Sequence, residues 1–226
     1  MQSYGINDFE EFVKANSEEK YRDFHMRLTR SNYRINGIRI PILRKYAKEI
    51  AKSRDTADFL KQKSQYYEQC MLKGLLITYL KLDDKDFFPL LESYIGEIDD
   101  WALTDVVCSS LRRKDDIYLN KVKEYAKSKD VWFARWGVVA VMVNFYDKDE
   151  VIYEIADNLI AKDYYVDMAL AWLIQVLTVK NRAVAVSLMK SDKVSGQVKK
   201  LAVRKIKDSF RVSKEDKEYF AQIIEA

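Results

Sequence analysis

The chain has 226 residues, of which 48% are hydrophobic and 33% are charged, and its formal net charge is +4. This composition excludes a disordered chain, and apolar runs such as 138–143 are too short to span a bilayer. The first residues lack the basic stretch and apolar core of a secretory signal, so we expect a cytoplasmic protein with no membrane partner.

Apolar residues recur three and four positions apart almost throughout the chain, while glycine and proline occur only six and two times. This period predicts amphipathic helices rather than strands. In chain order, the apolar stripes are Phe9, Phe12 and Val13; Leu43, Tyr46, Ala47 and Ile50; Met71, Leu72, Leu75, Leu76 and Tyr79; Phe88, Leu91, Tyr94 and Ile95; Leu119, Val122 and Tyr125; and Ile152, Ile155, Ala156 and Leu159. Each stripe predicts one helix that faces the core.

Polar residues that can cap a helix precede several stripes, and Pro41 suits a first turn that follows Asn36-Gly37. The candidate caps are Asn7-Asp8, Asp83-Asp84, Asp99-Asp100, Asp115-Asp116 and Asp163. Short connections between roughly a dozen helices predict an all-α fold, a curved solenoid of antiparallel helix pairs that resemble degenerate HEAT-like repeats in an α-α superhelix. No linker divides the chain, so we predict one domain over residues 1–226 and a monomer.

The residues that carry chemistry gather in the middle of the chain. Trp101 and Asp105 lie four positions apart on one predicted helix, which places a carboxylate beside an indole. Arg135 follows within the aromatic segment 132–136, and Trp172 follows two tyrosines. Because equivalent positions of successive repeats line up along one groove of a solenoid, the sequence permits these four residues to converge on one small site.

Each of these residues also has a purely structural interpretation. Trp132 and Trp136 are expected mostly in the core. A salt bridge to Arg135 would explain the carboxylate of Asp105 in an apolar helix as well as a catalytic role would. The single histidine, His25, receives no role, and the two cysteines are expected to be buried thiols, so we expect no metal site and no cofactor.

A basic run lies near the C-terminal end, with one acidic residue, Asp208, in its midst. Its members are Lys199, Lys200, Arg204, Lys205, Lys207 and Arg211. A solvated helix surface explains such a run as well as contact with phosphate groups does.

Four motifs in this order, followed by the basic run, resemble the DNA alkylation repair glycosylases with HEAT-like repeats. The segment from Asn36 to Ile50 resembles the helix opening of that family, Gly-hydrophobic-Arg-x-Pro-x-x-Arg, which includes Arg39. Trp101-x-x-x-Asp105 resembles its tryptophan and catalytic aspartate, Trp132-x-x-Arg135 its Trp-x-x-Arg element, Ala171-Trp172 its second groove tryptophan, and the basic run its last DNA-contacting repeat.

The resemblance implies a monofunctional glycosylase that excises N3- and N7-alkylated purines from double-stranded DNA without a deep base pocket. The catalytic residues would be Asp105, Trp101 and Trp172. The DNA-binding residues would be Arg135, Arg39, Lys199, Lys200, Arg204, Lys205 and Lys207. An alkylated purine is already cationic and can leave without a general acid, so a single carboxylate that stabilises the positive sugar would suffice.

Two alternatives stay open. Proficient members of the family carry an aromatic-bearing second helix ahead of the glycine and proline, whereas residues 28–36 here predict a broken, polar connection in which that element is missing. A non-catalytic DNA-binding paralogue with HEAT-like repeats is therefore the alternative function. A protein-interaction solenoid is the third possibility, and it would leave the basic run unused.

Overall fold

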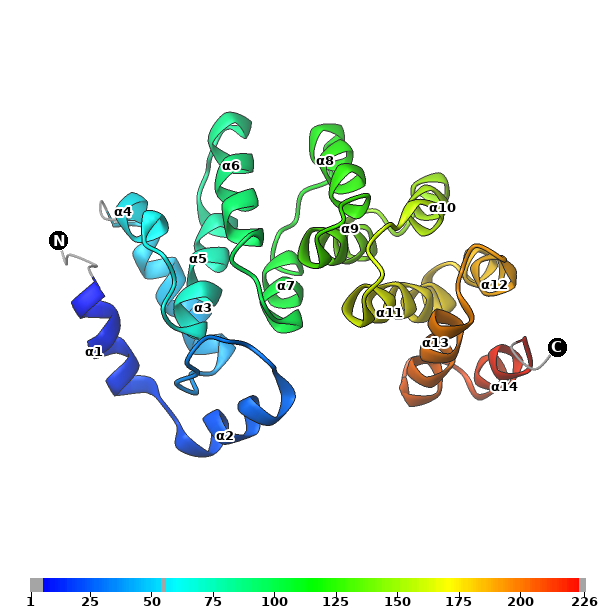
Figure 1. The fold of residues 1–226 in the computed structure, drawn as a ribbon, viewed down its shortest axis with the longest axis horizontal. Helices are drawn as coiled ribbons and strands as arrows, with labels where there is room; N and C mark the ends of the chain where they lie inside the picture. Colours follow the sequence, from blue (N-terminus) through cyan, green and yellow to red (C-terminus); the bar gives the residue numbers. More distant parts are fainter. Residues whose placement is uncertain (1–5, 54–55, 224–226) are drawn as a thin grey trace. The chain divides into compact units, whose positions relative to one another are not determined.

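The computed structural model describes the backbone of residues 6–53 and 56–223, with side chains from Asp8 onward (Figure 1). Across these residues the chain forms fourteen helices and no strand, which confirms the all-α class. The helices are α1 (Ile6–Asn16), α2 (Glu19–Leu28), α3 (Ile40–Ile50), α4 (Thr56–Lys61), α5 (Tyr67–Tyr79), α6 (Asp84–Ile95), α7 (Trp101–Cys108), α8 (Asp116–Ala126), α9 (Val131–Asn144), α10 (Asp149–Asn158), α11 (Tyr164–Lys180), α12 (Arg182–Lys190), α13 (Gly196–Asp208) and α14 (Lys214–Ile223).

The chain divides into two compact units, residues 1–111 and residues 112–226. In the first unit, α5 is the central helix, and it packs against α3, α6 and α7. Gly74 on α5 makes this packing possible, because a Cβ there would lie 2.4 Å from the Tyr94 ring and 2.6 Å from the Val107 side chain. Helix α6, which carries Tyr94, and helix α7, which carries Val107, therefore approach the α5 backbone more closely than a larger residue at position 74 would allow.

Residues 29–39 connect α2 to α3 without forming a helix, as the sequence predicted for 28–36. The carboxylate of Glu68, which is 1% exposed, accepts the amide N–H groups of Gly37 at 2.8 Å and Asn36 at 3.0 Å. Gly37 has a φ of +85°, a left-handed conformation that favours glycine. A buried carboxylate on α5 thus fixes the turn that leads into Pro41 and α3.

The first half of the same connection is held by the turn between α6 and α7. The Asp99 carboxylate accepts the Ser31 hydroxyl at 2.7 Å and the Asn32 amide at 2.6 Å. The Tyr33 hydroxyl donates to the Glu97 carbonyl at 2.9 Å. The polar residues of this connection therefore serve as anchors, and the connection is a built part of the first unit.

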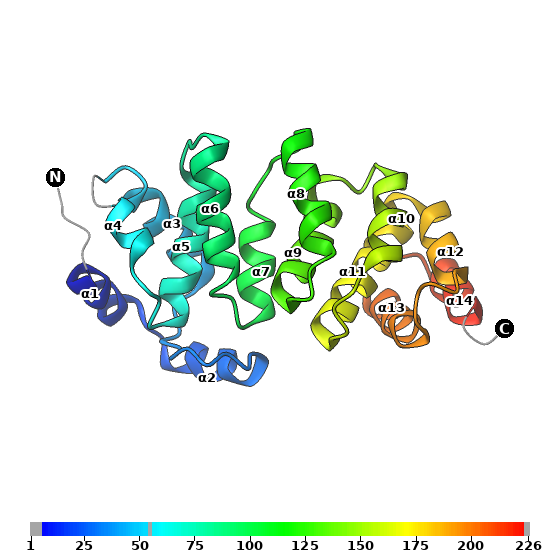
Figure 2. The same ribbon diagram turned by 45° about the horizontal axis from the view of Figure 1, so that its top comes forward.

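In the second unit, the helices form two layers of sequence neighbours (Figures 1 and 2). Helices α9, α11 and α13 pack side by side in one layer, and α8, α10, α12 and α14 pack in the other. Gly137 on α9 lets α8 approach, because a Cβ there would lie 2.6 Å from the Ala126 amide nitrogen. This arrangement of neighbouring pairs is the packing that a helix-pair solenoid requires.

Several predicted helix starts are confirmed by side-chain caps. Asp100, Asp115 and Asp163 accept a first-turn amide N–H of α7, α8 and α11, respectively. Asp83 stands at the start of α6 without a capping hydrogen bond, whereas Asn7-Asp8 lies inside α1. Pro41 occupies the first turn of α3. Three further caps that the sequence analysis did not single out are Asp130, Asn181 and Ser195.

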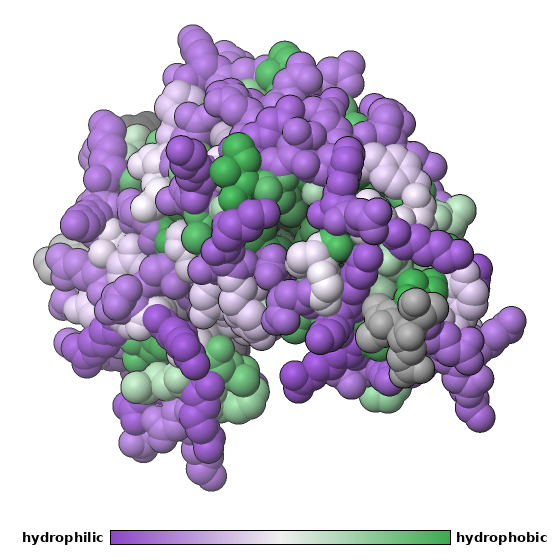
Figure 3. Space-filling view, turned by 45° about the vertical axis from the view of Figure 1, so that its right-hand side comes forward, coloured by the Kyte–Doolittle hydropathy of each residue, from purple (hydrophilic) through white to green (hydrophobic). Residues whose placement is uncertain are grey.

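The surface seen in Figure 3 is mostly hydrophilic, with hydrophobic side chains in small patches. Cys70 and Cys108 are buried free thiols, as predicted. Among the described helices, none has both the length and the apolar character needed to cross a membrane.

Candidate functional site

Trp101 and Asp105 lie one turn apart on α7, as predicted. The helix begins at Trp101 because the Asp100 carboxylate accepts the Ala102 amide at 2.9 Å and so satisfies a first-turn donor. The indole N–H of Trp101 donates to the Leu28 carbonyl at the end of α2, with 3.3 Å between the atoms. The indole is thus held against α2, while part of its surface stays open to solvent.

The Asp105 side chain lies deeper and is only 9% exposed. Thr104 directly before it and Val107 two positions after it on α7 are fully buried. A carboxylate in such surroundings acts through a lower effective dielectric than one at the surface, so its attraction for a nearby positive charge is stronger. Chemically, this position suits the stabilisation of a developing cation.

A polar cluster adjoins the start of α7. The Tyr67 hydroxyl donates to the fully buried Asp100 carboxylate at 3.0 Å, and the His25 ring meets the Tyr67 ring edge-on with 4.6 Å between centroids. Burial raises the pKa of Asp100 above its ordinary 3.8, although the bonds from Ala102 and Tyr67 oppose this shift. Desolvation lowers the pKa of His25 below 6.5, although the negative charges of Glu68 and Asp100 partly raise it again. The α2–α5–α7 junction is therefore sensitive to the charge on His25.

The structure corrects the expectation that an aromatic-bearing second helix is missing. Helix α2 spans Glu19–Leu28 and carries Tyr21 and Phe24, and the non-helical connection begins only after it. The polar residues from 29 to 36 form the anchors described above, which is why that segment resembles a break in the sequence. Phe24 and Leu28 are 50% and 51% exposed. Helix α2, whose Leu28 carbonyl accepts the Trp101 indole N–H, therefore also presents apolar surface to solvent.

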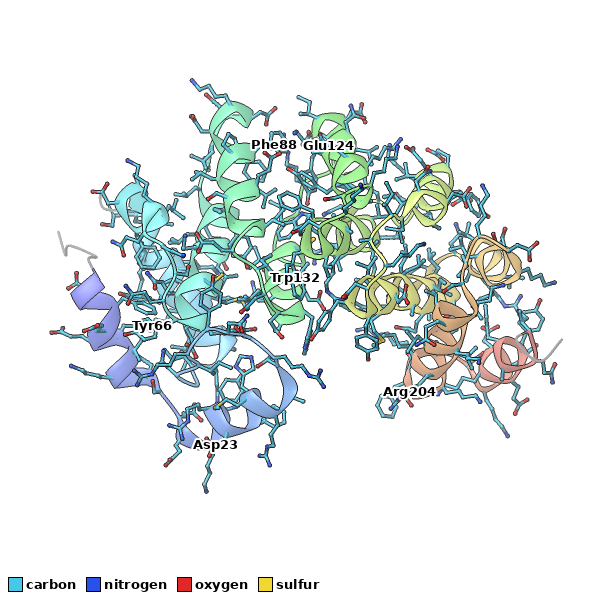
Figure 4. All side chains as sticks on the ribbon, in the orientation of Figure 1. Asp23, Tyr66, Phe88, Glu124, Trp132 and Arg204 are labelled. Atoms are coloured by element: carbon cyan, nitrogen blue, oxygen red, sulfur yellow. The ribbon has the colours of Figure 1, made fainter. Side chains whose placement is uncertain are left out.

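Arg135 lies on α9 with 4% of its surface exposed. Its Nη1 donates to the Tyr165 carbonyl on α11 at 2.5 Å, and the Tyr165 ring packs against Trp132 with 5.1 Å between centroids. Trp132, labelled in Figure 4, is half-buried, whereas Trp136 is fully buried as predicted. Arg135 therefore braces α9 against α11, and its contact with a phosphate stays a prediction.

Trp172 lies on α11 and is half-buried. It lines an open pocket of about 530 Å³ together with residues of α13 and of the turn that follows α13. The Lys205 ammonium lies 5.8 Å from the centre of the Trp172 ring, a cation–π distance. The structure thus brings together Trp172 and one member of the basic run.

The basic run occupies α13 and its C-terminal turn. Val198, Ala202 and Ile206 are buried on one side of α13, which turns Lys200, Arg204 and Lys207 outward to solvent. Lys199 and Lys205 are half-buried, and Arg204 is labelled in Figure 4. Within the described part of the chain, Lys199, Lys200, Arg204 and Lys207 form no ion pair. This basic face of α13 is open to an anionic partner.

Arg39 differs from the lysines and arginines of α13, because it has an acidic partner. Its Nε and Nη2 atoms each lie 2.8 Å from an oxygen of the Glu18 carboxylate, and its guanidinium lies over the Tyr21 ring at 4.9 Å. The Arg39 guanidinium accordingly lowers the pKa of Glu18. Arg39 links α2 to the start of α3, and its predicted contact with DNA would have to compete with Glu18.

The predicted residues are shared between the units: Trp101, Asp105 and Arg39 belong to the first, and Arg135, Trp172 and the basic run to the second. Sequence reasoning missed Glu68 and Asp99, which anchor the connection after α2. A signal for Glu68 exists in the sequence, because it is an acidic residue at the start of a helix that is otherwise largely apolar.

Comparison with known proteins assigns the chain to a family. The described residues contain no group of side chains suited to hold a metal ion. No curated protein and no solved structure matches the sequence. The sequence profile of the DNA alkylation repair enzymes matches residues 6–206. The chain therefore belongs to the DNA alkylation repair enzyme family, which indicates a role in DNA alkylation repair with DNA as the partner.

Proposed function

We propose that the protein is a monofunctional DNA glycosylase that hydrolyses the N-glycosidic bond of N3- and N7-alkylated purines in duplex DNA. The observation that carries this proposal is the pair on α7, a buried carboxylate one turn from an indole that α2 holds in place. Membership of an alkylation repair family supports the same reaction class.

The proposed chemistry needs few groups, because an N3- or N7-alkylated purine carries a positive charge and is a good leaving group. As its bond to C1′ stretches, positive charge moves onto the sugar, and the Asp105 carboxylate stabilises that charge and orients the attacking water. The electron-rich face of the Trp101 indole attracts the cationic base or sugar by roughly 0.5–2 kcal/mol. Neither step requires a second carboxylate as general acid, in contrast to ordinary glycoside hydrolysis.

The second unit supplies the grip on DNA in this proposal. Lys200, Arg204 and Lys207 project from α13 without acidic partners among the residues described. Each phosphate that such a side chain contacts releases condensed counterions, so binding weakens steeply as salt rises. Trp172 contacts the substrate strand from the neighbouring helix α11, and Arg135 holds a phosphate if its bond to Tyr165 opens.

The test is release of free base by the Asp105→Asn variant. It should lower the excision rate at least about a hundredfold, because it removes the charge that stabilises the transition state, while DNA affinity stays nearly constant. Asp86→Asn is the matched control, since Asp86 is an exposed carboxylate on α6, and it should excise at the wild-type rate. Equal excision by Asp105→Asn and wild type would refute the assigned role.

A non-catalytic DNA-binding paralogue is the alternative function. The sequence-based reason for it is the broken, polar connection ahead of α3, whereas α2 with Tyr21 and Phe24 supplies an aromatic-bearing helix before that connection and supports the glycosylase instead. This alternative predicts salt-sensitive DNA binding with no base release from wild type or from any variant.

A further inference from the structure

Arg44 lies in the middle of α3, and its side chain reaches the C-terminal end of α7, the helix that carries Asp105. Its Nη1 donates to the Ser110 hydroxyl at 2.6 Å, and its Nη2 donates to the Val106 carbonyl at 3.4 Å. The motif Gly-hydrophobic-Arg-x-Pro-x-x-Arg ends at Arg44, and the proposed function gives this residue no task. One side chain of α3 thus bonds to the end of α7 at two points.

The Val106 carbonyl needs a side-chain donor because of the way in which α7 ends. A helix leaves its last carbonyl groups without partners in the helix itself. The Ser110 N–H bonds to the Val107 carbonyl at 2.9 Å, and the Val106 carbonyl instead accepts the Ser110 hydroxyl at 2.6 Å and the Arg44 guanidinium. A cation is favourable at this place, because the carbonyl end of a helix carries partial negative charge.

Helix α7 depends on such contacts, because it has only eight residues and so short a helix is marginally stable by itself. The Asp100 carboxylate holds its first turn through the Ala102 amide at 2.9 Å. Arg44 holds its last turn. Asp105 stands one residue before Val106, so the turn that carries this carboxylate is the turn that Arg44 fixes.

We propose that Arg44 is a positioning residue for base excision, which sets the orientation of the Asp105 carboxylate by fixing the end of α7 and does not itself contact DNA. The inference rests on the proposed function, because it assigns Arg44 to the same reaction. Arginine suits this task, since its planar guanidinium offers separate N–H groups to two acceptors at once, whereas the lysine ammonium is a single point charge.

The experiment measures release of 7-methylguanine from methylated duplex DNA in a single turnover, with enough protein to bind all of the DNA and at a temperature well below the unfolding midpoint. Arg44→Ala should lower the maximal excision rate by about ten- to a hundredfold, because a catalytic group displaced by about 1 Å loses this much. The Kd for the same DNA should change by less than about twofold, since a positioning residue acts on the transition state and not on binding.

Two further measurements separate positioning from a general loss of structure. Arg44→Lys should excise at a rate between those of Arg44→Ala and wild type. Guanidinium chloride, at a concentration far below the one that unfolds the protein, should restore part of the rate of Arg44→Ala, whereas sodium chloride at the same concentration should not. Ser110→Ala, which removes one acceptor and no charge, should lower the rate by a smaller factor and tests the same contact if Arg44→Ala does not fold.

Lys45→Ala is the matched control, because Lys45 is the next residue of α3 and is exposed, and it should excise and bind as wild type does. Excision by folded Arg44→Ala at the wild-type rate would overturn the positioning role. A loss of DNA affinity with an unchanged maximal rate would also overturn it and would make Arg44 a DNA contact. Failure of the wild type itself to release base is a separate result, which overturns the proposed function and this inference with it.

Discussion

Replacement of Glu68 by glutamine tests whether a buried carboxylate holds the connection between α2 and α3 in place. In the structure, one Glu68 oxygen accepts the amides of Gly37 and Asn36 at 2.8 and 3.0 Å, and the other accepts the Asn36 side-chain amide at 3.1 Å. Glu68→Gln removes the charge from these bonds and turns an NH₂ group toward donors. Loss of one charge-assisted bond together with one unsatisfied donor lowers the free energy of unfolding by about 2–3 kcal/mol.

At about 2–4 °C per kcal/mol for a chain of this size, the melting temperature should fall by about 4–12 °C. Thermal unfolding followed by circular dichroism measures this change, and hydrogen exchange at the Asn36 and Gly37 amides locates it. Glu124→Gln is the control, because Glu124 is 67% exposed in a surface pair with Lys121 at 3.2 Å and should shift stability by less than about 1 kcal/mol. If Glu68→Gln unfolds and exchanges like wild type, the anchoring role of Glu68 is refuted.

Three further predictions follow from individual contacts. Gly137→Ala should destabilise the second unit by about 1–3 kcal/mol, because its Cβ would meet the Ala126 backbone at 2.6 Å, whereas Gly196→Ala, with open space around it, should be neutral or stabilising in the same denaturant titration. NMR titration of the single imidazole should give His25 a pKa below 6.5. The contribution of the neutral imidazole to the free energy of unfolding is then complete above pH 6.5 and is lost as the pH falls toward the folded-state pKa. A measured pKa at or above 6.5 would contradict the burial argument. Arg204→Ala should lower the salt slope of DNA binding by about one, and an unchanged slope would remove Arg204 from the interface.

Much of the fold could be predicted from the sequence because the signals are local. Apolar stripes at helical spacing identify helices such as α3 and α6 directly, and a capping carboxylate ahead of a stripe marks a start, as at Asp115. The connection after α2 could not be predicted in this way. Its polar residues take partners far along the chain, such as Glu68 and Asp99, and the same composition occurs in loose linkers.

The candidate site shows the same division between local and distant information. The four-residue spacing of Trp101 and Asp105 follows from helix geometry alone. The sequence did not indicate that the Leu28 carbonyl accepts the Trp101 indole N–H or that Arg135 is buried against Tyr165. Nor did it indicate that Arg39 forms an ion pair with Glu18. Each of these depends on a tertiary contact, and side-chain type gives no information on which partner is near.

Release of 3-methyladenine and 7-methylguanine from methylated duplex DNA is the most direct measurement of the proposed excision of alkylated purines. The account predicts that the wild-type protein releases both free bases, leaves abasic sites and requires no added metal or cofactor. Tight binding of the same DNA with no free base released above the spontaneous rate would contradict it.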